Sequence, residues 1–209
     1  MKHGFLKKLA NCKVVSFDIF DTLVVRKCKE PKNVFELVEN RFEQMHGHQT
    51  FSFEQIRIMS EAEARKNKNG GEVFLEDIYQ VVSKYIGKEL SSILMSMEFE
   101  TELDVCEANK DIVNLYQAIS KSKDVFMVSD MYLGIERIKS ILSSCNIPQP
   151  KRLYISCEVN ASKRNRELYK LLMKENNLRA RDILHIGDNF ISDYINPKLL
   201  GMQSVWVRR

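Results

Sequence analysis

Residues 14–26, VVSFDIFDTLVVR, place two carboxylates inside an otherwise apolar stretch. Residues 13–18 are rich in Val and Phe, which predicts a buried β-strand that ends at Asp18. Asp21 follows three positions later, and apolar residues then resume. An acid at this point can simply end the strand or cap the next turn, and it can also carry chemistry. The rest of the sequence is needed to choose between these interpretations.

The composition is that of an ordinary soluble protein. Of 209 residues, 44% are hydrophobic, which suits one domain, or one domain with an insertion, built on its own core. The five cysteines are odd in number and form no CxxC pair, which indicates unpaired thiols in a reducing compartment. Lysines interrupt the apolar residues of 1–17, and no run reaches membrane-spanning length. We therefore expect a cytoplasmic protein with no membrane partner.

Helical periodicity follows the first strand without interruption by strands. It predicts helices over 31–47, from 52 to a break at 67–71, up to Gly87, and over 89–106. Ser52 and Gln55 resemble a capping box at the start of the second helix. From 109 onward helices and strands alternate. The predicted helices are 109–121, 134–144 and 163–176, and the predicted strands are 124–128, 152–156, 183–186 and 203–207.

This alternation predicts an α/β fold, a Rossmann-like parallel sheet with helices on both faces. The helical stretch near the N-terminus does not fit into the sheet, and we expect it to form a separate helical insertion over its edge. The predicted division is a core of residues 1–26 and 108–209 and an insertion of residues 27–107.

Polar residues follow four of the predicted strands. Parallel strands present their carboxyl ends to a common crevice, so these residues are expected to gather there. Clustered carboxylates repel one another unless a cation joins them, and oxygen ligands without His or Cys suit Mg²⁺. The residues concerned are Asp18, Asp21, Ser129, Asp130, Lys163, Asp188 and Asp193.

Four of these features resemble the haloacid dehalogenase (HAD) superfamily when taken in order. They are DxxxT from Asp18, the strand-end Ser129, Lys163, and GDxxxxD ending at Asp193. The insertion resembles the α-helical cap of that superfamily. VSDMYL and GDNFISDYINPKLLGM resemble a bacterial subgroup associated with polysaccharide-synthesis genes, whose members are sometimes joined to glycosyltransferases.

The resemblance implies a Mg²⁺-dependent phosphatase or phosphotransferase that acts on a small phosphorylated metabolite through an aspartyl-phosphate. Asp18 would be the nucleophile and a metal ligand. The main-chain carbonyl of Phe20 and the carboxylate of Asp188 would be further ligands. Asp193 would order the outer shell of the metal or Lys163.

Three other residues would contact the substrate. Ser129 and Lys163 would hold the phosphoryl group, as the resemblance implies. Arg26 could bind a substrate anion bidentately, and a surface ion pair is the alternative. A protein partner or a fused transferase domain is left open.

The sequence departs from the superfamily at the general acid/base, which is usually an Asp two positions after the nucleophile. That position is Phe20, and Asp21 comes one residue late. Side chains alternate along an extended segment, so Asp21 would face away unless the loop breaks the alternation. A substitute acid, slow turnover and a non-catalytic domain that binds a phosphorylated ligand all remain open. Dehalogenases also lack this acid but need no metal, and the intact GDxxxxD favours a metal.

The remaining polar residues have simpler interpretations. Asp130 is expected to cap a turn, and His185, between apolar residues of a buried strand, is expected to be a core histidine. Arg164 and Arg166 are interpreted as a solvated helix face. This basic cluster is short and has no interleaved aromatic residues, and the net charge is only +4, so we expect no nucleic-acid partner.

Overall fold

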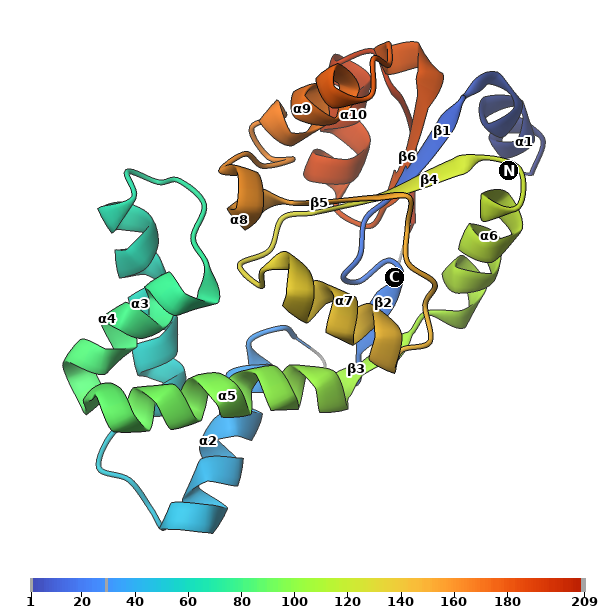
Figure 1. Cartoon of the computed structure of the whole chain (residues 1–209). Helices are drawn as coiled ribbons and strands as arrows, with labels where there is room; N and C mark the ends of the chain where they lie inside the picture. The colour runs from blue at the N-terminus through green and yellow to red at the C-terminus, as the bar shows by residue number, and fades with distance from the viewer. Residues whose placement is uncertain (1, 29, 208–209) are drawn as a thin grey trace.

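The computed structural model describes residues 2–28 and 30–207 (Figure 1). Within these residues, five parallel strands form one sheet in the order β5-β4-β1-β6-β7. The predicted α/β fold with a parallel sheet is therefore confirmed. The strands are β1 (Val14–Phe17), β4 (Asp124–Ser129), β5 (Arg152–Ile155), β6 (Ile183–Gly187) and β7 (Gln203–Trp206).

Strand β1 lies at the centre of the sheet. Val14 is in register with Asp124 of β4 and with Ile183 of β6, and all four residues of β1 are buried. A strand with both edges paired and both faces covered reads as a continuous apolar run, which is what the sequence contains. Its carboxyl end therefore meets the ends of β4 and β6.

Helices cover both faces of the sheet (Figure 1). Val15 and Phe17 join the apolar cluster that includes α6 and α7, whereas Val14 joins the cluster that includes α9. Alternation along β1 therefore turns Ser16 toward the α9 side. The helices around the sheet are α1 (Lys2–Asn11), α6 (Lys110–Ser120), α7 (Ile135–Ser144), α8 (Ser156–Val159), α9 (Glu167–Glu175) and α10 (Asn196–Leu199), with the short turns η1 (Ala180–Asp182) and η2 (Phe190–Ile195).

Four helices occupy residues 30–107, all of which the structure describes, and we name them the helical block. The chain leaves the core through β2 (Val24–Arg26) and returns to it through β3 (Cys106–Ala108). These two strands pair antiparallel. The division into a core and a cap stays a prediction, but entry and exit of the block lie side by side. The helices are α2 (Asn33–His46), α3 (Phe53–Asn67), α4 (Leu75–Ile86) and α5 (Lys88–Val105).

Several helices of the helical block begin or end at residues that the sequence predicts. Gly47 and Gly87 end α2 and α4 with φ angles of 81° and 82°, a conformation that glycine adopts without strain. The side chain of Ser52 accepts a hydrogen bond from the N–H of Gln55 at the start of α3. These predicted helix boundaries are confirmed.

Two local predictions are wrong. Helix α1 was not predicted, because its lysines break the apolar pattern. The helix predicted over 163–176 begins only at Glu167. Ser162 and Asn165 exchange side-chain-to-backbone hydrogen bonds that hold a turn, and Arg166 has a φ of 70°. Arg164 and Arg166 are exposed, as predicted, but they lie in this turn and not on a helix.

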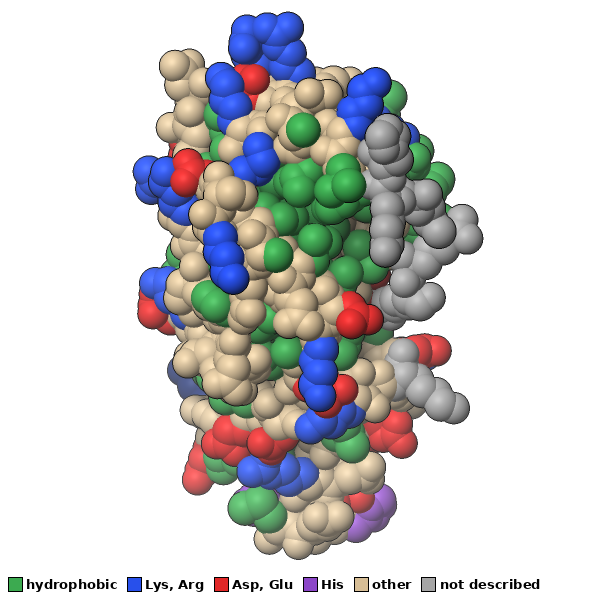
Figure 2. Space-filling view, turned by 90° about the vertical axis from the view of Figure 1, so that its right-hand side faces the viewer, with side chains coloured by type: hydrophobic (Ala, Val, Ile, Leu, Met, Phe, Trp, Pro, Cys, Tyr) green, Lys and Arg blue, Asp and Glu red, His purple; other side chains and the backbone are tan. Residues whose placement is uncertain are grey.

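The described part of the face in Figure 2 carries no continuous basic stripe. In Figure 2, Lys and Arg side chains are scattered among acidic ones over the described part of the face shown, and a hydrophobic area lies in its upper half. Among the described helices, none combines the length and apolar character needed to cross a membrane. All five cysteines are unpaired, as predicted.

Candidate active site

A cavity of about 480 Å³ lies between the carboxyl ends of the strands and the helical block. The strand-end residues named in the sequence all contribute to it, together with residues of the block and of the loops leading into it. Its lining is Asp18, Phe20, Asp21, Arg26, Pro31, Lys32, Phe35, Glu61, Glu102, Ser129, Asp130, Met131, Tyr132, Lys163, Asp188, Asn189, Ser192 and Asp193.

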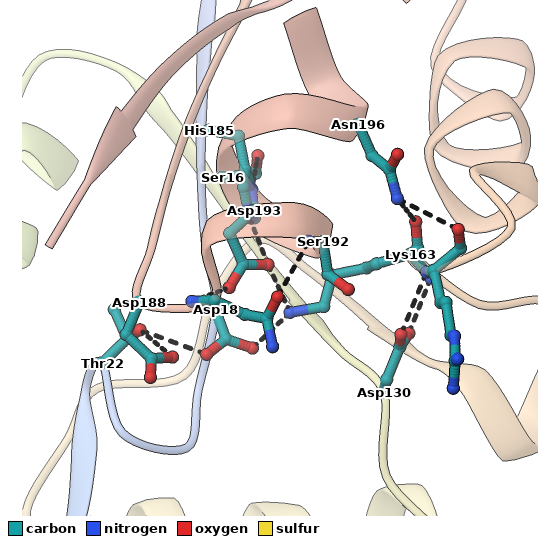
Figure 3. Close-up of polar contacts among 12 residues, drawn as sticks. Ser16, Asp18, Thr22, Asp130, Lys163, His185, Asp188, Ser192, Asp193 and Asn196 are labelled. Carbon is teal, nitrogen blue, oxygen red and sulfur yellow. Dashed lines mark hydrogen bonds and ion pairs between the residues drawn. The ribbon is translucent and has the colours of Figure 1, made fainter. Parts of the chain in front are cut away.

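Asp18 lies directly after β1 and is held on every side. Its N–H donates to the carbonyl of Ile186 at 2.9 Å, which continues the pairing with β6. Thr22 Oγ1 donates to Oδ2 at 3.1 Å, and Lys163 Nζ donates to Oδ1 at 2.5 Å. Asp18 is only 5% exposed. The two donors fix the orientation of its carboxylate (Figure 3).

Lys163 bridges two acids from a loop that other strand ends hold in place. Its Nζ donates to Asp18 and, at 2.7 Å, to Oδ1 of Asp193. Its backbone N–H donates to Oδ1 of Asp130 at 2.7 Å, and Asn196 Nδ2 donates to its carbonyl at 3.0 Å. Asp130 therefore has the loop-holding role that was expected of it, and this role positions the lysine.

Asp193 reaches the site because of the glycine that ends β6. A β-carbon at Gly187 would lie 2.5 Å from the carboxyl carbon of Asp193, so a larger residue there would displace the acid. The carboxylate is fully buried. Its Oδ2 accepts from the N–H of Asn189 at 2.9 Å, and its Oδ1 accepts from Lys163 and lies 3.2 Å from His185 Nε2.

Burial and charge act in opposite directions on these groups. Burial raises the pKa of Asp18 more than Lys163 lowers it, and the carboxylates of Asp193 and Asp188 raise it further. Burial disfavours the charged form of Asp193, but Lys163 and His185 outweigh burial and lower its pKa. Burial also opposes the charge of Lys163, yet the neighbouring carboxylates raise its pKa. Three carboxyl groups, those of Asp18, Asp188 and Asp193, therefore surround the single ammonium of Lys163.

The carboxylates fit a hard divalent cation. Asp18, Asp188 and Asp193 each place an oxygen within 4.8 Å of the others, the only such group that the described residues contain. Thr22 Oγ1 also lies 3.4 Å from Oδ1 of Asp188, which draws this acid toward Asp18. An all-oxygen set suits Mg²⁺. Asp193 has no exposed surface and contacts Lys163, His185 and Asn189, which suits the outer-shell role predicted for it.

Solved structures with the same architecture are numerous, although no protein-family model and no curated protein matches the sequence. The L-2-haloacid dehalogenase of Xanthobacter autotrophicus aligns over 94% of this chain and 77% of its own, with 13% identity and a TM-score of 0.64. A HAD-like family hydrolase of Xanthomonas campestris aligns over 95% and 82%, with 15% identity and a TM-score of 0.64. The magnesium-bound structure of YfnB of Bacillus subtilis, described as a putative HAD-hydrolase, aligns over 94% of this chain and 89% of its own, with 13% identity and a TM-score of 0.61.

The chain has the HAD-like fold. At these identities the likeness establishes the fold and leaves the reaction open, so the chemistry must be argued from the side chains.

Phe20 and Asp21 both line the cavity of this HAD-like fold. The chain leaves the extended conformation at Asp21, whose φ of 62° lies in the left-handed region. Strand alternation therefore does not separate the two side chains, and Asp21 is not turned away from the site. Phe20 is 9% exposed and its ring lies 4.5 Å beneath the Arg26 guanidinium.

The two remaining predicted substrate contacts differ. Ser129 ends β4, is 2% exposed and lines the cavity near Asp18. Arg26 also lines the cavity, but its guanidinium donates to both oxygens of Glu102, at 2.9 and 3.1 Å. Its side chain is 6% exposed, so the alternative of an ion pair holds, but the pair is buried and not at the surface.

Sequence reasoning missed the contribution of α5 to the site. Glu98 and Glu102 lie one helical turn apart among buried residues of α5, where an acid needs a partner. That combination is a signal for a buried ion pair, although it does not name the arginine that completes it. His185 is buried, as expected of a core histidine, but its contact with Asp193 was not foreseen.

Proposed function

We propose that the chain is a Mg²⁺-dependent phosphatase or phosphotransferase that acts on a small phosphorylated metabolite through an aspartyl-phosphate on Asp18. The observation that carries the proposal is the strand-end cluster, in which Lys163 bonds Asp18 and three carboxylates lie within 4.8 Å of one another. The chain shares the HAD-like fold with YfnB, a putative hydrolase whose structure holds magnesium, and this supports magnesium-assisted hydrolysis.

The chain's own residues supply most of the reaction. Lys163 and Ser129 hold the phosphoryl oxygens while an oxygen of Asp18 attacks phosphorus. The bond from phosphorus to the ester oxygen breaks, and that oxygen takes a proton as the alcohol leaves. Water, or an acceptor alcohol, then attacks the aspartyl-phosphate, which releases the phosphoryl group and restores the Asp18 carboxylate.

Asp21 is the residue we assign to the proton transfers. It lines the cavity together with Phe20. Its left-handed backbone breaks the strand alternation that would otherwise point its side chain away from the site. It donates its proton to the leaving oxygen and, once ionised, can accept one from the attacking water.

A divalent cation would be held by Asp18, Asp188 and the main-chain carbonyl of Phe20, with Asp193 fixing the neighbouring groups. When bound, Mg²⁺ would neutralise charge that accumulates on the phosphoryl oxygens. The excess of carboxylates over Lys163 is the feature of this site that calls for such an ion.

A weakly catalytic domain that binds a phosphorylated ligand is the second candidate. The observation in its favour is the packing of Phe20 beneath Arg26, at the position where the superfamily's acid usually stands. Dehalogenation ranks lower, although several structural neighbours are dehalogenases. Dehalogenases need no metal, whereas the three clustered carboxylates of this site favour a divalent cation.

Three broader features also remain proposals. The unpaired cysteines support a cytoplasmic location, since reducing compartments keep thiols free. The subgroup associated with polysaccharide-synthesis genes, and a fused transferase or protein partner, rest on the sequence resemblance alone.

The decisive experiment is hydrolysis of p-nitrophenyl phosphate with Mg²⁺ by the wild type and by Asp18→Asn. We expect the variant to fall to the uncatalysed background, because an amide is a poor nucleophile. Asp124→Asn is the matched control, because Asp124 is an exposed acid that begins β4 at the far end of the strand. Equal rates for wild type and Asp18→Asn would refute the proposal. Thermal stabilisation by phosphate without turnover would favour the binding domain.

A further inference from the structure

His185 is a buried histidine that the proposed reaction does not use. It lies in β6 with no exposed surface, and its ring has a polar contact at each nitrogen. Nδ1 lies 2.8 Å from Oγ of Ser16, and Nε2 lies 3.2 Å from Oδ1 of Asp193. Figure 3 shows Ser16 and His185 above Asp193, which in turn lies above Asp18.

The partners of the ring determine where its proton lies. An ionised carboxylate only accepts hydrogen bonds, so the contact with Asp193 requires a proton on Nε2. In a neutral ring Nδ1 then carries a lone pair, and Ser16 must donate its hydroxyl proton to it. Asp193 therefore selects the tautomer, and the Ser16 hydroxyl supports it by donating to Nδ1.

These contacts form a path that begins on β1 at Ser16 and ends at Asp18, directly after β1. It runs from Ser16 through His185, Asp193 and Lys163 to Asp18, with 2.7 Å between Asp193 and Lys163 and 2.5 Å between Lys163 and Asp18. A single oxygen of Asp193, Oδ1, meets both His185 and Lys163. Rotation of that carboxylate would therefore disturb the lysine that bonds Asp18.

We propose that His185, held by Ser16, is a positioning residue that fixes the Asp193 carboxylate and, through it, the Lys163 ammonium beside Asp18. This inference rests on the proposed function, in which Lys163 holds the group that Asp18 attacks. Neither residue lines the cavity, so both act through others. Any buried imidazole beside Tyr169 needs partners for its nitrogens; what links this ring to the site is that one partner, Oδ1 of Asp193, also accepts from Lys163.

His185→Phe separates the two roles, because it keeps an aromatic ring and removes both hydrogen bonds. We expect kcat/KM for p-nitrophenyl phosphate to fall about tenfold to hundredfold, the usual effect of losing such an indirect partner, with most of the loss in kcat. His185→Gln should restore most of the activity, since its amide N–H can donate to Asp193. A folded His185→Phe with wild-type kcat/KM would overturn the proposal.

Ser16→Ala provides a test that does not depend on His185→Phe folding. We expect a smaller loss of kcat, and no further loss when Ser16→Ala is added to His185→Phe, because the two residues act as one unit. Ser91→Ala is the matched control: Ser91 is a buried serine of α5 whose hydroxyl donates to the carbonyl of Tyr79 at 2.9 Å. Unchanged kcat in Ser16→Ala would contradict the positioning role.

Nitrogen NMR of the imidazole ring tests the arrangement without any substrate. At neutral pH we expect a proton on Nε2 and none on Nδ1 in the wild type, and a shifted Nδ1 resonance in Ser16→Ala, because Nδ1 loses its hydrogen-bond donor. A proton on Nδ1 in the wild type would overturn the inference whatever the enzyme does. The expected tautomer in a protein that hydrolyses no phosphate ester would refute the proposed function and leave the positioning of Asp193 supported.

Discussion

Two buried groups of charged side chains among the described residues differ in charge balance. One lies in the helical block, where Arg57 is fully buried and donates to both oxygens of Glu98 at 2.7 and 2.9 Å. Tyr79 donates to the same acid at 2.7 Å, and the guanidinium lies 4.6 Å from the Phe35 ring. Tyr132 completes the cluster with a hydrogen bond to Glu98 at 3.3 Å.

The other cluster lies at the strand ends and is not balanced. Among the described residues there, Lys163 meets Asp18 and Asp193 while Asp188 stands nearby, and the group opens into the cavity. A buried ion pair in which each charge has its partner can have a structural role alone. A buried group with more charges of one sign than the other favours binding of an oppositely charged ligand. The difference in balance is what separates a structural cluster from a functional one here.

Asp21→Asn, at the strand-end cluster, has the largest expected effect on activity. Asn tolerates the left-handed backbone of Asp21, so the fold should be retained. We expect kcat to fall by about 10²–10⁴, the range for loss of a general acid or base. Steady-state hydrolysis of an aryl phosphate with Mg²⁺ measures the effect. If kcat stays at the wild-type value, another group performs the proton transfers.

Glu98→Ala would break the structural cluster. It leaves the fully buried Arg57 without its main partner, and removing one member of a buried pair costs about 3–5 kcal/mol of unfolding free energy. Urea unfolding measures this cost. Glu98→Gln is the control, because it keeps hydrogen-bonding oxygen in place and should destabilise less. Similar stability for wild type and Glu98→Ala would show that the balanced cluster contributes little.

Binding of Mg²⁺ to the strand-end cluster should stabilise the folded protein. At one hundred times its dissociation constant, a ligand that binds only the native state adds about 2.7 kcal/mol, which thermal unfolding detects as a higher Tm. Asp188→Asn should remove this response, while Glu98→Gln should keep it. A Tm that does not respond to Mg²⁺ in the wild type would argue against a metal site at the strand ends.

Much of the fold could be predicted because the local signals agreed. The apolar run before Asp18, the alternation after residue 109, and the glycines at 47 and 87 each follow from short-range chemistry. The polar residues at the strand ends could be listed for the same reason, since parallel strands share an edge. Their gathering into one cavity is a consequence of strand order.

The remaining features depend on contacts between distant segments. The turn before α9 was predicted as helix, but the main-chain N–H groups of Lys163 and Arg164 donate to Asp130, 33 and 34 residues away, which local periodicity does not reveal. His185 meets Asp193 through an eight-residue excursion, and meets Ser16 only because β1 pairs with β6. The conformation of Asp21 likewise has no signature in the pattern of apolar residues.

The narrow neck formed by β2 and β3 has an implication for engineering. Val24 lies opposite Ala108 and Arg26 lies opposite Cys106, so the whole helical block enters and leaves through adjacent backbone positions. A block of another length or shape could be grafted there without moving the sheet. The Arg26–Glu102 pair spans that neck and is buried, so a successful chimera must carry both residues across together or replace both with apolar ones.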